Sequence, residues 1–181
     1  MSIITLTPLT EKDREQFILK NQRAFKYGAT EEFGCFDSRT DEGSEIISRE
    51  TIERSIDLGI AYCIREDGRF VGGVVLRIDK DTRHNHLELL FIDPEAHSKG
   101  IGYKAWLEVE RLYPDTLIWE TCTPYFDKRN IHFYINKCGF HAVEFFNRFH
   151  PDPHDPETGE ENNYDEADGF EGMFRFEKQM R

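Results

Sequence analysis

In residues 91–114, FIDPEAHSKGIGYKAWLEVERLYP, a predicted strand ends at Ile92 and a predicted helix begins near Gly100. Gly102 follows in the first turn of this helix, and Pro114 marks its end. The first amide groups of a helix have no partner within the helix, so their N–H groups can bind an anion. The sequence therefore predicts an anion site at the point where this strand is followed by this helix.

The two glycines and their neighbours indicate the kind of anion. Because glycine has no Cβ, a ligand can approach the backbone closely at Gly100 and Gly102. His97 and Lys99 can add hydrogen-bond donors or positive charge. A helix N-terminus contributes only about 0.3–2 kcal/mol to the binding of a nearby anion, so one phosphate is held weakly and a pyrophosphate that touches several amides is held far better. The expected ligand carries a diphosphate.

Three classes of nucleotide site compete for this loop. A Walker loop needs GxxxxGKS or GxxxxGKT, which the chain lacks. A dinucleotide-binding fold needs a third glycine and, about twenty residues later, an acidic residue, all after an early strand, and these requirements are not met. The third class is a coenzyme A site.

Strands and helices alternate on both sides of the loop. In HLELLFID (residues 86–93), Leu87, Leu89 and Phe91 are expected on one face and Leu90 and Ile92 on the other, as in a central strand that is covered on both sides. A strand, a helix and a strand with short links predict a parallel pair joined by a right-handed crossover. The other predicted elements are a strand at 2–9, helices at 10–28 and 48–58, a hairpin at 60–79 with its turn at Asp67 and Gly68, a strand at 116–122, a helix at 127–139, and strands at 140–149 and 170–178.

These elements predict an α/β (α+β) fold with a mixed, mostly antiparallel sheet of about seven strands and helices on both faces. The chain of 181 residues is expected to form a single domain over residues 1–181. In the helix at 127–139, Ile131, Tyr134, Ile135 and Cys138 are expected to form one apolar stripe.

The loop also resembles a known family. HSKGIG (residues 97–102) resembles the Gln/Arg-x-x-Gly-x-Gly/Ala signature of the GNAT superfamily of acyl-CoA-dependent N-acetyltransferases. LELLFIDPEAHSKGIGYKAW (residues 87–106) is similar to the family's fourth strand, pyrophosphate loop and third helix, and NIHFYINKCGF (residues 130–140) to its last helix and following strand. The resemblance covers residues 61–149 and implies a three-layer GNAT-like fold with acetyl-CoA as co-substrate. It implies direct transfer of an acetyl group to a primary amine in a ternary complex; the alternative is a catalytically silent CoA-binding sensor or scaffold.

The chain departs from the family pattern at two positions. His97 stands where the family usually has Gln or Arg. Tyr134 lies five residues before Gly139, whereas the family's tyrosine lies four residues before its glycine. One residue rotates a side chain by about 100° around a regular helix, so Ile135 takes the expected place unless this helix or its exit carries one extra residue.

Transfer to an amine requires a base. With a pKa near 10.4, only about one alkylamine in a thousand is neutral at pH 7, a cost of about 4 kcal/mol. Glu88 is the candidate base, because it is expected on the Leu90 and Ile92 face among apolar neighbours that would raise its pKa. A structural Glu88, paired with a Lys, an Arg or a backbone N–H, is the other interpretation, and Glu120 is the reserve.

The resemblance implies the remaining roles. Tyr134 is expected to protonate the departing CoA thiolate, and Asn130 to hydrogen-bond the pantetheine arm. The main chain at Phe91 and Ile92 is expected to bind the pantetheine amides, which requires the central strands to splay apart. The expected cofactor-binding residues are Phe91, Ile92, Asp93, His97, Ser98, Lys99, Gly100, Ile101, Gly102, Tyr103 and Asn130.

The charge of the chain bears on its partners. The 35 acidic and 23 basic residues give a net charge of −12, and residues 150–169 hold eight acidic residues and no Lys or Arg. Such a chain is not expected to bind nucleic acid. Residues 25–58 and the acidic loop at 150–169 are expected beside the acceptor, so a cationic amine is consistent with their charge, as is a simply solvated surface.

Metal, membrane and disulfide functions are not expected. The four cysteines show no CxxC pair, and the prolines around His150 and His154 prevent a regular helix from holding these histidines four residues apart. The first thirty residues contain no signal-like apolar segment, and no run of eighteen apolar residues occurs in the chain. A cytoplasmic protein without a metal or a membrane partner is expected, with its oligomeric state left open, a homodimer included.

Overall fold

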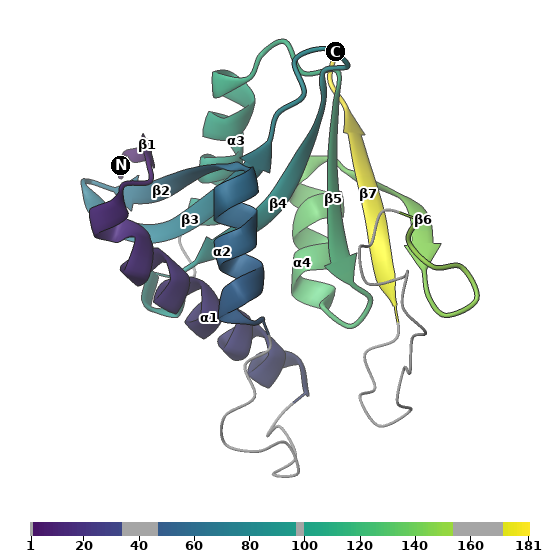
Figure 1. Cartoon of the computed structure of the whole chain (residues 1–181), viewed down its shortest axis with the longest axis horizontal. Coiled ribbons are helices and arrows are strands. Elements are labelled where there is room, and N and C mark those ends of the chain that lie inside the picture. Colours follow the sequence, from purple (N-terminus) through teal and green to yellow (C-terminus); the bar gives the residue numbers. More distant parts are fainter. Residues whose placement is uncertain (1, 34–46, 97–99, 154–171) are drawn as a thin grey trace.

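A seven-stranded sheet forms the centre of the molecule, in the order β1-β2-β3-β4-β5-β7-β6 (Figure 1). The computed structural model describes residues 2–33, 47–96, 100–153 and 172–181. Only the β4·β5 pair is parallel among the pairs of named strands, and the others are antiparallel. The strands are β1 (Ile4–Pro8), β2 (Ile60–Glu66), β3 (Arg69–Arg77), β4 (His84–Ile92), β5 (Ile118–Pro124), β6 (His141–Phe146) and β7 (Met173–Gln179). The fold class predicted from the sequence is confirmed.

Helices cover both faces of the sheet (Figure 1). The helices are α1 (Glu11–Phe33), α2 (Arg49–Leu58), α3 (Ile101–Leu112) and α4 (Lys128–His132), with a 3-10 turn η1 (Pro94–Ala96) and a π-helical segment η2 (Phe133–Cys138). Phe17 of α1 and Ile52 of α2 belong to one buried cluster, and Trp106 of α3 belongs to another. No helix in the described ranges has the length and apolar composition that crossing a bilayer requires.

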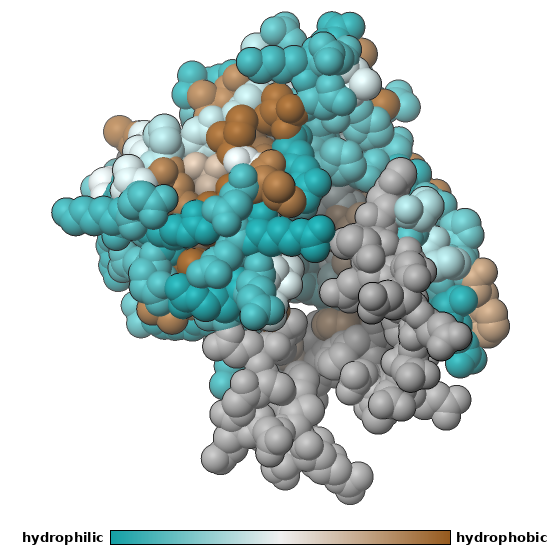
Figure 2. Space-filling model, in the orientation of Figure 1, coloured by the Kyte–Doolittle hydropathy of each residue, from teal (hydrophilic) through white to brown (hydrophobic). Residues whose placement is uncertain are grey.

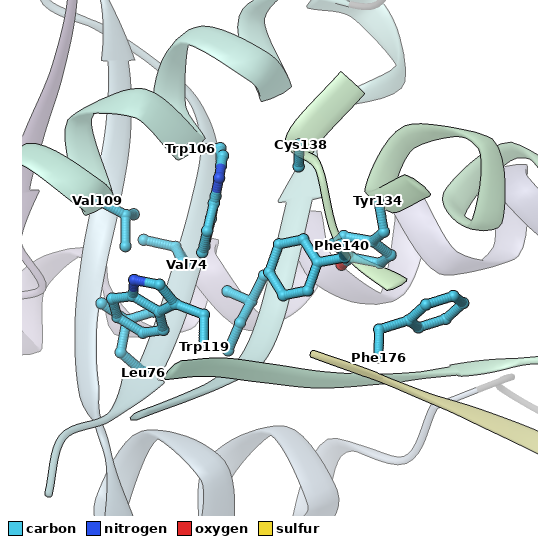
Figure 3. Packing of buried hydrophobic residues seen from close by; sticks show 10 residues of the cluster. Val74, Leu76, Trp106, Val109, Trp119, Tyr134, Cys138, Phe140 and Phe176 are labelled. Carbon is cyan, nitrogen blue, oxygen red and sulfur yellow. The ribbon is translucent and has the colours of Figure 1, made fainter. Parts of the chain in front are cut away.

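The core on the α3 face is rich in aromatic side chains (Figure 3). Trp106 and Trp119 meet edge to face with ring centroids 5.4 Å apart, and the ring of Phe140 lies 5.2 Å from that of Trp106. Such edge-on contacts add to the stabilisation that burial of the rings provides. This core fixes α3 and η2 against the sheet, and both elements border the site described below.

Helix α1 is longer than the sequence pattern predicts. The helix continues through Gly28, where an end was expected, and reaches Phe33. A glycine inside a helix costs roughly 0.5–1 kcal/mol, which a helix with a buried face tolerates. The expectation that Gly28 ends this helix was therefore wrong.

Strand β4 contains a bulge that the alternating pattern conceals. Leu89 pairs with Val75, but Leu87 pairs with the next residue, Leu76, so Glu88 is an extra residue in β4. Leu87 therefore packs in the cluster of Trp106, on the opposite face of the sheet from Leu89. The prediction that Leu87 shares a face with Leu89 was wrong, because a bulge shifts the period-2 alternation by one residue.

The helix predicted at 127–139 changes geometry half way. Residues 128–132 are α-helical, whereas in η2 the Gly139 N–H bonds to the Tyr134 carbonyl, five residues earlier. This wider turn holds one extra residue, so Tyr134 and Cys138 are both buried and Ile135 is 38% exposed. The predicted apolar stripe is thus correct for Tyr134 and Cys138 and wrong for Ile135.

Gly73 of β3 lies where Phe17 of α1 packs against the sheet. A Cβ at Gly73 would lie 2.2 Å from a ring atom of Phe17 and 2.6 Å from a ring atom of Phe91. We expect Gly73→Ala to lower the free energy of unfolding by about 1–3 kcal/mol, because these packed rings must move. Urea unfolding measures the loss. The matched control is Gly28→Ala, where a Cβ meets nothing within 4 Å, and an unchanged urea midpoint for Gly73→Ala would contradict the prediction.

Candidate active site

Strands β4 and β5 are paired at one end only. Their parallel ladder runs from His84↔Ile118 to His86↔Glu120, although β4 continues to Ile92 and β5 continues to Pro124. Beyond the ladder the two strands diverge (Figure 1). The sheet is therefore open along the second half of these two strands.

The open part of the sheet forms a cavity of about 550 Å³. In the space-filling view the molecule is hollowed between the half that carries α1 and α2 and the half that carries β6 and β7 (Figure 2). A volume of this size is typical of small-molecule sites. The lining comes from residues 88–92 of β4, 121–124 of β5, 100–103 of α3, Ala24, Phe25, Gly28 and Ala29 of α1, and Ala96, Phe126, Asp127, Arg129, Asn130, His132, Phe133, Tyr134 and Lys137.

The N-terminus of α3 opens onto this cavity. Gly100 is the N-cap in the left-handed conformation, with φ of 66°, and its helix has no side-chain cap within the described ranges. The N–H of Lys104 bonds back to the carbonyl of Gly100 at 3.1 Å, which is the first hydrogen bond of the helix. The amides of residues 101–103 therefore belong to the first turn, where N–H groups have no partner within the helix. The predicted residues Gly100, Ile101, Gly102 and Tyr103 all line the cavity. The predicted residues His97, Ser98 and Lys99 lie outside the described residues.

Gly102 faces the aromatic wall of the cavity. A Cβ at this position would lie 3.5 Å from the ring of Phe133 and 3.7 Å from the side chain of Ile92. These are ordinary contact distances, so an alanine fits, whereas a larger side chain has to extend into the space between these groups. Gly102 therefore keeps the mouth of the cavity open beside the first amides of α3.

The main chain of β4 is directed to both sides of the strand. The N–H of Asp93 bonds to the carbonyl of Val71 in β3 at 2.8 Å, and Phe91 pairs with Gly73 of β3. Because main-chain groups alternate between the two edges of a strand, those of Ile92 point towards β5 and the cavity, and those of Phe91 point towards β3. The structure thus favours Ile92 over Phe91 among the predicted main-chain contacts.

Asp93 lies outside the cavity lining described above. Its buried carboxylate pairs with Lys20 and lies 3.6 Å from Arg23, and it accepts the N–H of Glu95 at 3.2 Å. Burial opposes ionisation, but the hydrogen bond from Lys20 and these other contacts hold the pKa of Asp93 below its usual range. Asp93 therefore joins η1 to α1, and its contact with the cofactor stays a prediction.

Asn130 lies in the cavity lining at the start of α4. Asp127 is the N-cap of this helix and accepts the N–H of Asn130 at 2.9 Å, while the side-chain amide of Asn130 donates to Asp127 at 2.7 Å. The carboxylate of Asp127 thus binds an N–H group in the first turn of the helix, as N-cap side chains do. Asn130 is thereby held in a fixed orientation beside the cavity.

Tyr134 lies in the cavity lining and is nearly buried. Its hydroxyl group hydrogen-bonds the side chain of Thr121, whose own hydroxyl donates to the carbonyl of Leu87 at 2.9 Å. Since Thr121 has a single hydroxyl proton, neutral Tyr134 is the donor in their hydrogen bond. Burial raises the pKa of Tyr134, and the hydrogen bond with Thr121 acts in the opposite direction. The result is a protonated phenol next to the opening between β4 and β5.

Glu88 lines the cavity from the bulge in β4. Its carboxylate lies 3.0 Å from Nε of Arg77, so the charged form has a partner, whereas apolar neighbours were predicted. The reserve candidate, Glu120, lies outside the cavity lining described above and accepts from Nη1 of Arg175 at 2.9 Å. Of the two carboxylates, only Glu88 reaches the cavity.

Thr121 is the residue that the sequence analysis missed. Its position two residues after Trp119 placed it on the buried face of a predicted strand, where a hydroxyl group needs a partner. That signal was present in the sequence, but the identity of its partners, Leu87 and Tyr134, depends on where the neighbouring strand and η2 lie.

Comparison with known proteins adds the family. The sequence pattern of the acetyltransferase (GNAT) family matches residues 26–140. The chain is 44% identical over 174 residues to the uncharacterized protein YrkN of Bacillus subtilis (strain 168), covering 94% of this chain and 90% of that protein.

Two solved structures have a similar fold. The ribosomal-protein-S18-alanine N-acetyltransferase from Escherichia coli is 13% identical with a TM-score of 0.66, covering 98% of this chain and 94% of that chain. The PaiA N-acetyltransferase from Thermoplasma acidophilum, solved in complex with coenzyme A, is 19% identical with a TM-score of 0.62, covering 98% and 99%. The matched segment of 115 residues contains the parallel strand pair and the glycine-led helix onto which it opens. The chain belongs to the acetyltransferase (GNAT) family.

Proposed function

We propose that the protein transfers an acetyl group from acetyl-CoA to a primary amine by direct attack in a ternary complex. The observation that carries this proposal is the cavity between β4 and β5, which meets the amides of the first turn of α3. The diphosphate of CoA binds these amides, and His97, Ser98 and Lys99 are the further contacts that the sequence predicts. The pantetheine arm then lies along β4, where the main chain at Ile92 and the side chain of Asn130 contact it.

The reaction needs one proton removed and one proton supplied. The neutral amine nitrogen attacks the thioester carbonyl, a C–N bond forms, the C–S bond breaks and the thiolate leaves. Glu88, whose carboxylate is paired with Arg77, accepts the amine proton directly or through a water molecule. Tyr134 donates its proton to the thiolate, and Thr121 can then turn its hydroxyl proton towards the phenolate.

Direct transfer agrees with the state of the cysteine in the cavity. Cys122 lines the cavity and part of its surface is exposed, yet burial of the thiol, followed by the nearby charges of Glu120 and Asp152, raises its pKa to about 12. A thiol needs to be deprotonated to act as a nucleophile. A covalent acetyl-cysteine intermediate is therefore disfavoured at neutral pH.

The pH dependence of the reaction tests the state of Tyr134. A general acid works below its pKa, so a pKa raised by burial above the usual value near 10 keeps Tyr134 protonated throughout the neutral and mildly alkaline range. We expect kcat to rise or stay level from pH 7 to about 10, as the amine deprotonates. Steady-state rates across this range measure it. A descending limb with a midpoint near pH 8–9 would contradict the assignment of Tyr134 as the acid.

The activity itself is tested by thiol release. Purified protein is mixed with acetyl-CoA and a panel of primary amines that includes polyamines, aminoglycosides and basic peptides, and free CoA thiol is recorded. Turnover with at least one amine, with the acetylated amine identified by mass spectrometry, is the expected result. CoA binding without turnover for any amine would favour the silent sensor or scaffold. Equal affinity for CoA, ATP and NAD would contradict the coenzyme A site.

A further inference from the structure

Two histidines and a glutamate converge outside the cavity lining. Nε2 of His84 lies 3.1 Å from Oε2 of Glu120, and Nδ1 of His86 lies 3.4 Å from Oε1 of the same carboxylate. The three candidate ligand atoms all lie within 4.8 Å of one another. The two imidazole rings stack at an angle of 11° with centroids 5.5 Å apart, and His84 faces Glu120 with Nε2 whereas His86 faces it with Nδ1.

The fold explains why these side chains meet. His84 and His86 are two residues apart in β4, so their side chains point to the same face of the sheet. His86 and Glu120 form the last pair of the parallel β4·β5 ladder. These three side chains therefore bridge the two strands at the last pair of their ladder, where the strands begin to separate.

From this geometry we infer that His84, His86 and Glu120 bind a divalent transition metal, with Zn²⁺ the best fit. Imidazole nitrogen and carboxylate oxygen are both common zinc ligands, at about 2.0–2.2 Å from the metal. In a tetrahedral site such ligand atoms lie roughly 3.3–3.5 Å from one another. The two histidine-to-glutamate distances, 3.1 Å and 3.4 Å, are close to this separation.

The hydrogen bonding of His84 supports the inference. Its Nε2 atom is buried and makes no hydrogen bond to any described residue, because the contact with Glu120 lacks hydrogen-bond geometry. A buried polar atom without a partner is uncommon in a folded protein. A metal ion between His84 and Glu120 would provide that partner.

The surrounding charges are compatible with a cation. Arg175 contacts Glu120 at 2.9 Å, Glu144 at 2.8 Å and Glu177 at 2.6 Å, so three carboxylates share one guanidinium group. The arginine restrains the orientation of Glu120, as the outer neighbours of metal ligands do, while its positive charge limits the affinity. Two formal negative charges remain in excess, and a divalent cation would balance them.

Three protein ligands leave one tetrahedral position for water or another ligand. The metal would join β4 to β5 where their ladder ends and so stabilise the pairing of these two strands. This inference does not depend on the proposed acetyl transfer, because it rests on residues outside the cavity lining and is tested by binding alone.

The test is a calorimetric titration of Zn²⁺ into the full-length chain, with any affinity tag removed and the protein first treated with a chelator. We expect one ion per chain, a micromolar or lower Kd, and a rise of the unfolding temperature on Zn²⁺ addition. His86→Ala and His84→Ala should each weaken binding at least about 30-fold. His141→Ala, an exposed histidine of β6, is the matched control and should leave binding unchanged.

Two further measurements separate this site from other causes of binding. Co²⁺ in place of Zn²⁺ should give the intense visible absorption of a four-coordinate ion in the wild-type chain, and Glu120→Gln should reduce it while the far-ultraviolet circular dichroism stays unchanged. The double variant His150→Ala/His154→Ala should retain binding. Loss of binding in that variant, retention in His84→Ala/His86→Ala, or no binding by the wild-type chain would each overturn the inference.

Discussion

Gly102→Leu is expected to weaken CoA binding at least about 100-fold, a loss of about 3 kcal/mol, while the chain stays folded. A Cβ at Gly102 already reaches contact distance from Phe133 and Ile92, so the rest of a leucine side chain must occupy the mouth of the cavity. There it would block the approach of a diphosphate to the first amides of α3. Calorimetry with CoA measures the affinity, and thermal unfolding measures the stability.

Gly102→Ala is the graded control for this substitution. Its Cβ would lie 3.5 Å from the ring of Phe133, an ordinary contact, so CoA affinity should change by less than about tenfold. Gly102 lies in the first turn of α3, where a leucine is compatible with a helical backbone. If Gly102→Leu bound CoA within threefold of the wild-type affinity, the diphosphate would have to lie elsewhere.

Tyr134→Phe is expected to lower kcat by about 10²–10⁴-fold, because general acid catalysis by a positioned side chain contributes about that much. CoA affinity should stay nearly constant, since the ring remains packed against Phe140 and Phe176 and only the hydroxyl group is lost. Stability should fall by about 1 kcal/mol, the usual cost of one hydrogen bond. Single-turnover rates at saturating acetyl-CoA separate the chemical step from binding.

A second tyrosine provides the matched control. The hydroxyl groups of Tyr113 and Tyr62 lie 2.7 Å apart, and neither residue is among the described residues that line the cavity. Tyr113→Phe therefore removes a comparable hydrogen bond and should leave kcat unchanged. Equal rates for Tyr134→Phe and the wild-type chain would refute the role of Tyr134 and would require another acid.

Thr121 connects the catalytic role proposed for Tyr134 to the geometry of the sheet. Its hydroxyl group accepts from Tyr134 and donates to the carbonyl of Leu87, at the point where the ladder between β4 and β5 has ended. The same side chain thus bonds both to the phenol of Tyr134 and to the main-chain carbonyl of Leu87. In the proposed mechanism Thr121 is a positioning residue, because it would act on the reaction through Tyr134.

Two features of the sequence led to correct conclusions about fold and family. The apolar strand that ends at Ile92 and the glycine-led helix that follows it predicted the parallel crossover. Both depend on local patterns: the period of apolar side chains and the conformation that Gly100 allows are properties of a few neighbouring residues. The family match over residues 26–140 agrees with the resemblance, which was found over residues 61–149.

The same local patterns misplaced several side chains. The alternation in HLELLFID put Leu87 on the wrong face, because a period-2 pattern does not show that Glu88 is inserted as a bulge against β3. The spacing of Tyr134 from Gly139 suggested a misplaced tyrosine, because a sequence does not show whether a turn closes after four residues or five. In each case the backbone accommodates one extra residue, as a bulge in β4 and as a wider turn in η2. Packing against a neighbouring element determines the position of that residue.

The sequence by itself determined the order of strands and helices and the glycine-led N-terminus of α3, because these depend on interactions between residues close together in the chain. Its motifs also indicated the family. Only the tertiary structure decided which side chains share a site. His86 and Glu120 are 34 residues apart, and Thr121 reaches Leu87 and Tyr134 from another strand. Such contacts depend on strand register and on the packing of α3 and η2, which arise from burial of the whole core and leave no periodic signal in the sequence.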